Sequence, residues 1–188
     1  LGLIMTGLGQ QQNRTVFDDV EFFVEPVGSI NTEASEIAPA FINDSIYFTA
    51  IPEKYFKIAG SKKKDRAFYT LWSASLDENG RVSSYRKVVP GFGNEYHEGP
   101  ADYCEATGEL FVTTSNISES DTIQEITSED KIRLRLVIKK LIDGKWQTTE
   151  ELPFNNNKFH FAHPAVSVTG DTLIFSSDVD SLSYGQLD

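Results

Sequence analysis

The chain contains an internal repeat, which restricts the folds that it can adopt. A Pro-Ala pair followed by a short apolar run occurs three times, with its prolines 61 and 64 residues apart, at Pro39, Pro100 and Pro164. A second proline precedes each copy at a similar spacing, and a turn glycine recurs in the first two copies. A constant period of this length is typical of proteins that stack one structural unit several times.

Each repeat predicts β-structure. The runs at 46–50 and 110–114 are short, rich in β-branched and aromatic residues, and bounded by turn residues. Gly80 and Gly144 provide the positive φ angles of tight hairpin turns. Residues 132–136 alternate apolar and charged side chains, which favours a half-buried strand over the competing helix at 128–142. Each repeat therefore predicts four strands, the content of one propeller blade.

The predicted architecture is all-β: a β-propeller fragment with two nearly complete four-stranded blades and a truncated third. The expected blades cover approximately 39–99, 100–163 and 164–188, the last being the truncated one. They belong to a partial propeller over 10–188, in which 16–30 forms a strand of the preceding blade.

Residues 1–9 are uncharged and mostly apolar, end with Gly7 and Gly9, and precede a polar stretch. This order matches the end of a secretory signal, in which small residues mark the cleavage site. We therefore interpret 1–9 as the remnant of a signal segment and expect an exported protein. A disordered or strand-forming N-terminus is the alternative.

Composition excludes several classes of function. The chain carries 17 Lys and Arg against 28 Asp and Glu, a net charge of −11, which argues against a nucleic-acid partner. Its single cysteine, Cys104, excludes an internal disulfide and any multi-cysteine metal site. No apolar run reaches the ~18 residues of a membrane-spanning helix, so we expect no transmembrane segment in the mature chain.

Few residues predict chemistry. His160 and His163 are close in sequence but lack a third ligand at a suitable spacing, so we expect no metal site. The polar cluster His97, Glu98, Asp102 and Cys104 could hold an acid–base or Cys–His pair, but a buried strand cysteine is the favoured interpretation. The chain has no nucleophile elbow and no nucleotide-binding loop, so we predict no catalytic residue and no cofactor.

The third repeat reads Pro164-Ala165-Val166-Ser167-Val168-Thr169-Gly170, followed after two residues by an apolar triplet and two serines. It resembles the TolB-type β-propeller repeat of bacterial envelope proteins, although Val168-Thr169 stands where that repeat has Pro-Asp. The segment 143–154 is similar to versions fused to an OmpA-like peptidoglycan-binding domain. The resemblance implies a periplasmic or outer-membrane-associated protein, linked to peptidoglycan through a domain beyond the chain.

We therefore expect a non-enzymatic, exported propeller that serves as a protein-interaction scaffold in a bacterial cell envelope. Its expected partners are envelope proteins or a peptidoglycan-linked assembly. The predicted partner-binding residues are Tyr55, Phe56 and His97, because exposed aromatic residues carry much of the energy of protein interfaces.

Two other functions stay open. One is the substrate-gating propeller of a serine peptidase or another hydrolase. The other is a glycan-binding module, in which Trp72 or Trp146 would stack against a sugar. Fold alone does not choose among these functions, because propellers support many of them.

Overall fold

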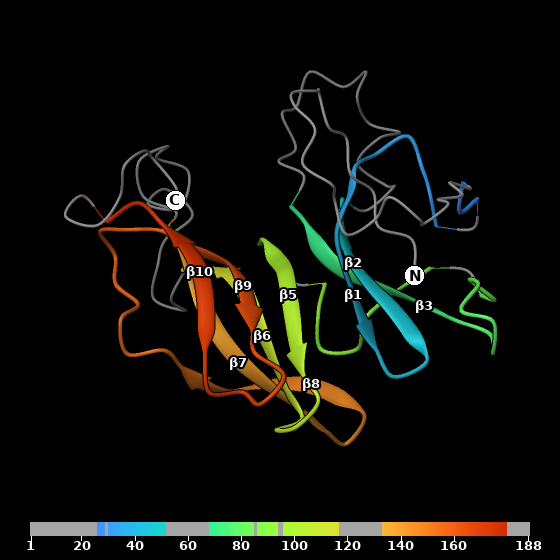
Figure 1. The fold of residues 1–188 in the computed structure, drawn as a ribbon. Coiled ribbons are helices and arrows are strands. Elements are labelled where there is room, and N and C mark those ends of the chain that lie inside the picture. The colour runs from blue at the N-terminus through green and yellow to red at the C-terminus, as the bar shows by residue number, and fades with distance from the viewer. Residues whose placement is uncertain are drawn as a thin grey trace, which may run out of the picture.

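The computed structural model describes residues 26–28, 30–51, 68–84, 86–93, 96–116 and 133–179. These residues form ten strands in three antiparallel sheets, arranged side by side in chain order (Figure 1). Within these ranges no helix is long and apolar enough to cross a membrane. The predicted all-β class is confirmed for this part of the chain.

Each of the first two sheets is a meander of four strands that follow one another in the chain. The first sheet contains β1 (Glu36–Ile42), β2 (Ser45–Ala50), β3 (Thr70–Ser75) and β4 (Lys87–Val88). The second contains β5 (Glu98–Cys104), β6 (Glu109–Ser115), β7 (Leu134–Ile142) and β8 (Lys145–Glu151). In the third, β9 (Phe161–Val166) pairs with β10 (Leu173–Ser177). This order agrees with the four strands expected of each repeat.

The segment for which the sequence allowed either a strand or a helix, residues 128–142, contains the strand β7. It pairs with β6 at seven successive positions and with β8 on its other side, which commits its backbone groups to the sheet. Its burial does not alternate, however, because the four consecutive residues Leu136, Val137, Ile138 and Lys139 are all buried. The expected half-buried strand is thus covered on both faces, which alternation alone did not predict.

The Pro-Ala marker corresponds to a β-bulge in the first hairpin of each sheet. The pairing shifts register between Ile37 and Ala40 and again between Glu98 and Ala101, and the β9–β10 hairpin has a similar shift. The residue before each proline has a positive φ: 51° at Ala38, 110° at Gly99 and 54° at His163. Because L-residues rarely adopt such angles, the bulge is a specific feature of the repeat.

The strand that opens each later sheet packs on the face of the sheet before it. β5 contacts β1, β2 and β3, whereas β9 contacts β5, β6 and β7. The bulges lie at these contacts. A side chain at Gly99 would overlap Thr49 of β2, and the backbone N–H of His163 donates to Thr113 Oγ1 of β6 at 3.0 Å. Two threonines at matching positions of the repeat therefore support two successive bulges.

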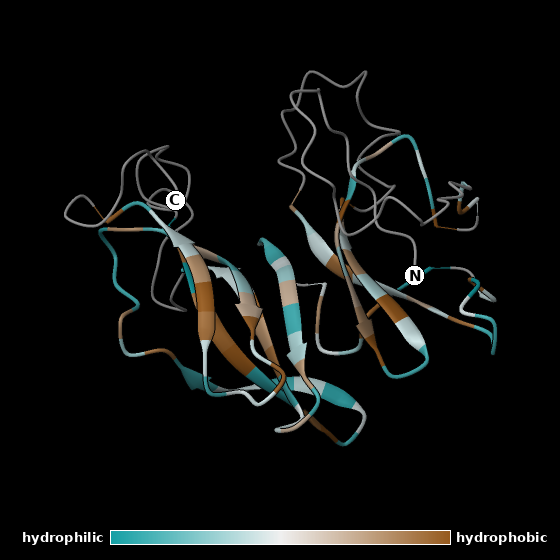
Figure 2. Ribbon diagram, viewed as in Figure 1, coloured by the Kyte–Doolittle hydropathy of each residue, from teal (hydrophilic) through white to brown (hydrophobic). Residues whose placement is uncertain are grey.

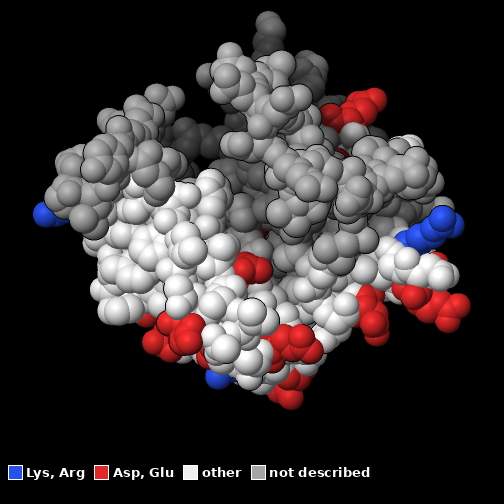
Figure 3. Space-filling view, viewed as in Figure 1, with Lys and Arg blue, Asp and Glu red and all other residues white. Residues whose placement is uncertain are grey.

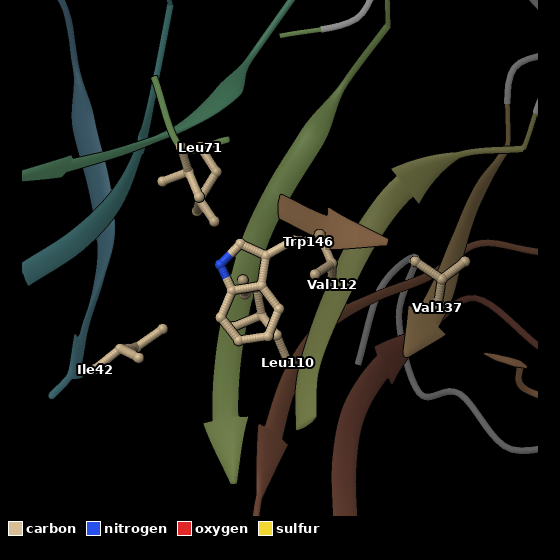
Figure 4. Close-up of a cluster of buried hydrophobic side chains, with 8 residues drawn as sticks. Ile42, Leu71, Leu110, Val112, Val137 and Trp146 are labelled. Atoms are coloured by element: carbon tan, nitrogen blue, oxygen red, sulfur yellow. The ribbon is translucent and has the colours of Figure 1, made fainter. Parts of the chain in front are cut away.

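Apolar clusters fill both faces of the second sheet. Toward the first sheet, Leu110, Val112, Val137 and Trp146 pack against a group that includes Ile42 and Leu71 (Figure 4). Toward the third sheet, the cluster contains Cys104, Phe111 and Ile138, with Val166 and Leu173 packed against it. Figure 2 shows the apolar residues concentrated in β7 and β10 and hydrophilic ones at the turns. Since full burial of one such side chain contributes roughly 1.5–3 kcal/mol, these contacts hold the sheets together.

Candidate functional site

A pocket with a volume of about 190 Å³ lies at one end of the second sheet, on the face turned toward the first sheet. Three strands and the segment before β5 supply the lining residues that matter here: His97, Glu98, Thr114, Arg135, Val137 and Lys139. The pairing of the strands explains their convergence. Glu98 lies opposite Thr114, and Thr114 lies opposite Arg135 on the next strand.

The side-chain alternation of β7 places two cations on the same face of the sheet. Residues two apart on a strand point to one side, so Arg135, Val137 and Lys139 share the face that forms the pocket. The two long cationic side chains flank the short apolar one between them. This arrangement brings positive charge into a protein that is acidic overall.

Lys139 is the most unusual residue of the pocket, because it is only 7% exposed. Nζ lies 5.0 Å from the centre of the Phe92 ring, within the range of a cation–π contact. Burial lowers the pKa of Lys139 below its ordinary value; nearby Glu98 opposes this shift, and Arg135 adds to it.

Glu98 is buried beside this lysine, but its contacts hold other parts of the chain. Its Oε2 accepts a hydrogen bond from the Gly93 backbone N–H at 2.6 Å and another from Thr70 Oγ1 at 3.2 Å. The carboxylate therefore ties the segment before β5 to β3 of the first sheet. It also contributes a negative charge to the pocket wall, which acts to raise the pKa of Lys139.

Two further donors in the pocket are buried without a partner in the described residues. They are the Thr114 hydroxyl and the Nε of Arg135. Another nitrogen of Arg135 donates to Glu151 Oε1 at 2.7 Å, which anchors the guanidinium at the pocket edge. Together with Lys139, these groups give the pocket three hydrogen-bond donors, two of which no described acceptor satisfies.

His97, predicted as a partner-binding residue, is half-buried and lines the same pocket. Its Nδ1 accepts a hydrogen bond from the Tyr69 backbone N–H at 3.2 Å, and its ring meets Phe68 edge-on at 5.0 Å. Burial lowers the pKa of His97. Tyr55 and Phe56, the other two predicted partner-binding residues, lie outside the described residues.

His160 repeats the role of His97 in the next sheet. Its Nδ1 accepts a hydrogen bond from the Leu134 backbone N–H at 3.1 Å, and its Nε2 lies 3.0 Å from Arg133. Each histidine precedes the leading strand of one sheet and binds the third strand of the sheet before it, or the residue next to that strand. We call this contact between successive sheets, made by His97 and by His160, a histidine latch. The sequence analysis did not predict it, although the two histidines are 63 residues apart, which matches the repeat.

The polar cluster predicted around Cys104 does not form one site. His97 and Glu98 line the pocket toward the first sheet. In contrast, Asp102 Oδ2 accepts a hydrogen bond from the Val166 backbone N–H at 2.8 Å, and the Cys104 thiol lies 3.7 Å from the Val168 carbonyl. Both of these contacts are with the β9–β10 hairpin, on the other face. The cysteine is therefore separated from the histidine by the sheet itself.

The remaining candidates have structural contacts. His163 lies 3.4 Å from Ser176, while Asp178 accepts a hydrogen bond from the His160 backbone N–H. In the ranges that the structure describes, no group of three or more His, Cys, Asp or Glu side chains could hold a metal ion. Trp146 is buried in the core, and Arg86 lies over the Trp72 ring at 4.4 Å. Both indoles are thus used in packing.

The surface at the hairpin turns is negatively charged, in contrast to the pocket with its two cationic side chains. Exposed Asp and Glu side chains lie at the hairpin turns, among them Asp44, Glu105 and Asp143, and Figure 3 shows several carboxylates along the lower edge of this face. These charges keep the ends of the sheets solvated.

Comparisons with protein-family models, with curated proteins and with solved structures find no match for this chain. The TolB-type resemblance therefore stays a prediction from the sequence.

Proposed function

We propose that this chain is part of a TolB-type β-propeller that acts as a non-enzymatic interaction scaffold in a bacterial cell envelope. The observation that carries the proposal is the repeated stacking of meander sheets. In both described cases the leading strand, with its positive-φ bulge, packs across the preceding sheet. Propellers repeat such a unit radially until 4–8 blades close a ring.

The second sheet supports a rigid scaffold role. It is packed on both faces, and histidine latches tie it to the sheets before and after it. A rigid stack gives fixed attachment points to the loops between its strands, and binding residues are often found on such loops. The proposed partner surface is the β2–β3 connection, which contains Tyr55 and Phe56, together with His97.

Photo-cross-linking in cells tests the scaffold role. A photoreactive amino acid at Tyr55 or Phe56 of the exported protein should cross-link to one discrete envelope protein. The same amino acid at Lys145, on the exposed β7–β8 hairpin turn, serves as the matched control and should not. Recovery of the protein in the cytoplasmic fraction, or the absence of envelope cross-links from the β2–β3 connection, would contradict the proposal.

A further inference from the structure

We infer that the pocket on the second sheet binds a carboxylate group, with Lys139, Thr114 and Arg135 as its hydrogen-bond donors. This inference goes beyond the proposed scaffold role, because it depends on the chemistry of one pocket and not on the number of blades or the compartment.

The unsatisfied donors carry this inference. Thr114 Oγ1 and Arg135 Nε are buried without a hydrogen-bond partner in the described residues, and the side chain of Lys139, which is only 7% exposed, lies beside them. All three side chains line the same pocket. Buried donors are nearly always satisfied, so the two unpartnered ones indicate that an acceptor is missing from this pocket. The missing group is therefore an acceptor, and a negatively charged acceptor compensates the ammonium best.

The charges around the pocket favour a carboxylate over a phosphate. Glu98 faces Lys139 from β5, and Glu151 already pairs with Arg135. A ligand with two negative charges would meet both carboxylates, whereas a singly charged group meets less repulsion. A carboxylate also offers two oxygens with about four lone-pair sites, enough for the three donors.

The size and walls of the pocket agree with a small ligand group. Its volume of about 190 Å³ exceeds the ~30 Å³ that one water occupies in the liquid, so several non-hydrogen atoms fit. Val137 lies between the two cationic side chains, and the aromatic ring of Tyr96 also lines the pocket. These apolar surfaces would contact the carbon atoms next to the carboxylate. A free small carboxylate and the side chain of an acidic peptide share this chemistry.

Binding is measured by titrating the full chain with acetate and following amide chemical shifts by NMR. Acetamide, which has the same shape without the charge, and inorganic phosphate are titrated in parallel. We expect saturable shifts with acetate at residues lining the pocket, and at least tenfold weaker binding of acetamide and of phosphate. A blocked peptide that carries one glutamate side chain distinguishes the source: tighter binding than acetate indicates a peptide ligand, and weaker binding indicates a free carboxylate.

Variants assign the site. Lys139→Met keeps the apolar stem without the charge and should weaken acetate binding at least tenfold. Thr114→Val removes a second donor at nearly constant volume and should weaken binding several-fold. Lys140→Met is the matched control, because Lys140 is exposed and pairs with Glu109 on the same strands, and it should bind acetate as the parent does. Binding should also weaken as pH rises and Lys139 loses its proton.

Three results would overturn the inference. They are the absence of saturable acetate binding, equal affinity for acetamide, and unchanged affinity in both Lys139→Met and Thr114→Val. If Lys139→Met fails to fold, Thr114→Val and the acetamide comparison still decide the question.

Discussion

Replacement of Gly99 by alanine tests the packing of β5 on the first sheet. Gly99 has a φ of 110°, and a Cβ at this position would overlap Oγ1 of Thr49 on β2. The backbone conformation alone costs an L-residue about 1–3 kcal/mol. Overlap in a packed interface costs about 1–3 kcal/mol more. The Gly99→Ala substitution should therefore lower the free energy of unfolding by about 2–6 kcal/mol. This is a large part of the 5–15 kcal/mol by which a typical folded protein is stable.

A double-mutant cycle separates the two contributions. Thr49→Ala removes the hydroxyl and methyl groups that the new Cβ would meet, while the Thr49 Cβ, 3.2 Å away, stays in place. By itself Thr49→Ala should change the free energy of unfolding by about 1 kcal/mol or less, because it loses a buried methyl but also a buried hydroxyl without a partner. In the Thr49→Ala background, Gly99→Ala should lower the free energy of unfolding by only about 1–3 kcal/mol, the cost of the positive φ for an L-residue.

Equilibrium unfolding in urea, followed by tryptophan fluorescence, provides the free energies. Trp146 is buried in the cluster between the first and second sheets and reports on the same interface. The two substitutions should couple by about 1–3 kcal/mol, with the double variant more stable than the sum of the singles predicts. Additive effects within about 0.5 kcal/mol would show that Gly99 does not face Thr49, and the proposed stacking of β5 on β2 would be wrong.

Three further predictions concern ionisable and strained residues. Lys139→Met should raise the free energy of unfolding in ligand-free buffer, because burial disfavours the charged form of the lysine, whereas Lys140→Met should not; urea titration of both variants checks this. Burial lowers the pKa values of His97 and His160 in the folded protein, so the unfolded state binds more protons and stability should fall as pH drops from above 6.5 through the folded pKa values. His97→Asn and His160→Asn keep an acceptor that does not titrate and should flatten this decline in acid-unfolding curves, while His163→Asn, at an exposed histidine, should retain it. His163→Gly should raise the melting temperature by a few degrees, since glycine relieves the left-handed φ of 54°; an unchanged or lower value would count against strain at this bulge.

Much of the secondary structure could be predicted from the sequence, because it depends on local rules. The apolar runs, the turn glycines and the period of the Pro-Ala pairs indicate strands and hairpins without reference to distant residues. The fourth strand expected in the first repeat is an exception, because it is reduced to β4 (Lys87–Val88) and an isolated bridge between Leu76 and Val82. Pairing at this edge of the sheet receives support from one side only.

The candidate site could not be predicted in this way. The alternation of β7 shows that Arg135, Val137 and Lys139 share a face, but it does not show that the face is covered. Phe92, whose ring lies 5.0 Å from Lys139 Nζ, and Glu98, whose charge acts on the lysine, are more than 40 residues earlier in the chain. Its burial and its lowered pKa therefore arise only when the segment before β5 packs against the second sheet.

The all-β class and the repeat follow from the spacing of residue types along the chain. The buried faces, the histidine contacts between sheets and the donors left without acceptors are visible only in the folded protein. The physical reason is that burial and hydrogen-bond satisfaction depend on residues that are distant in sequence, and a local pattern carries no information on which segment will cover it.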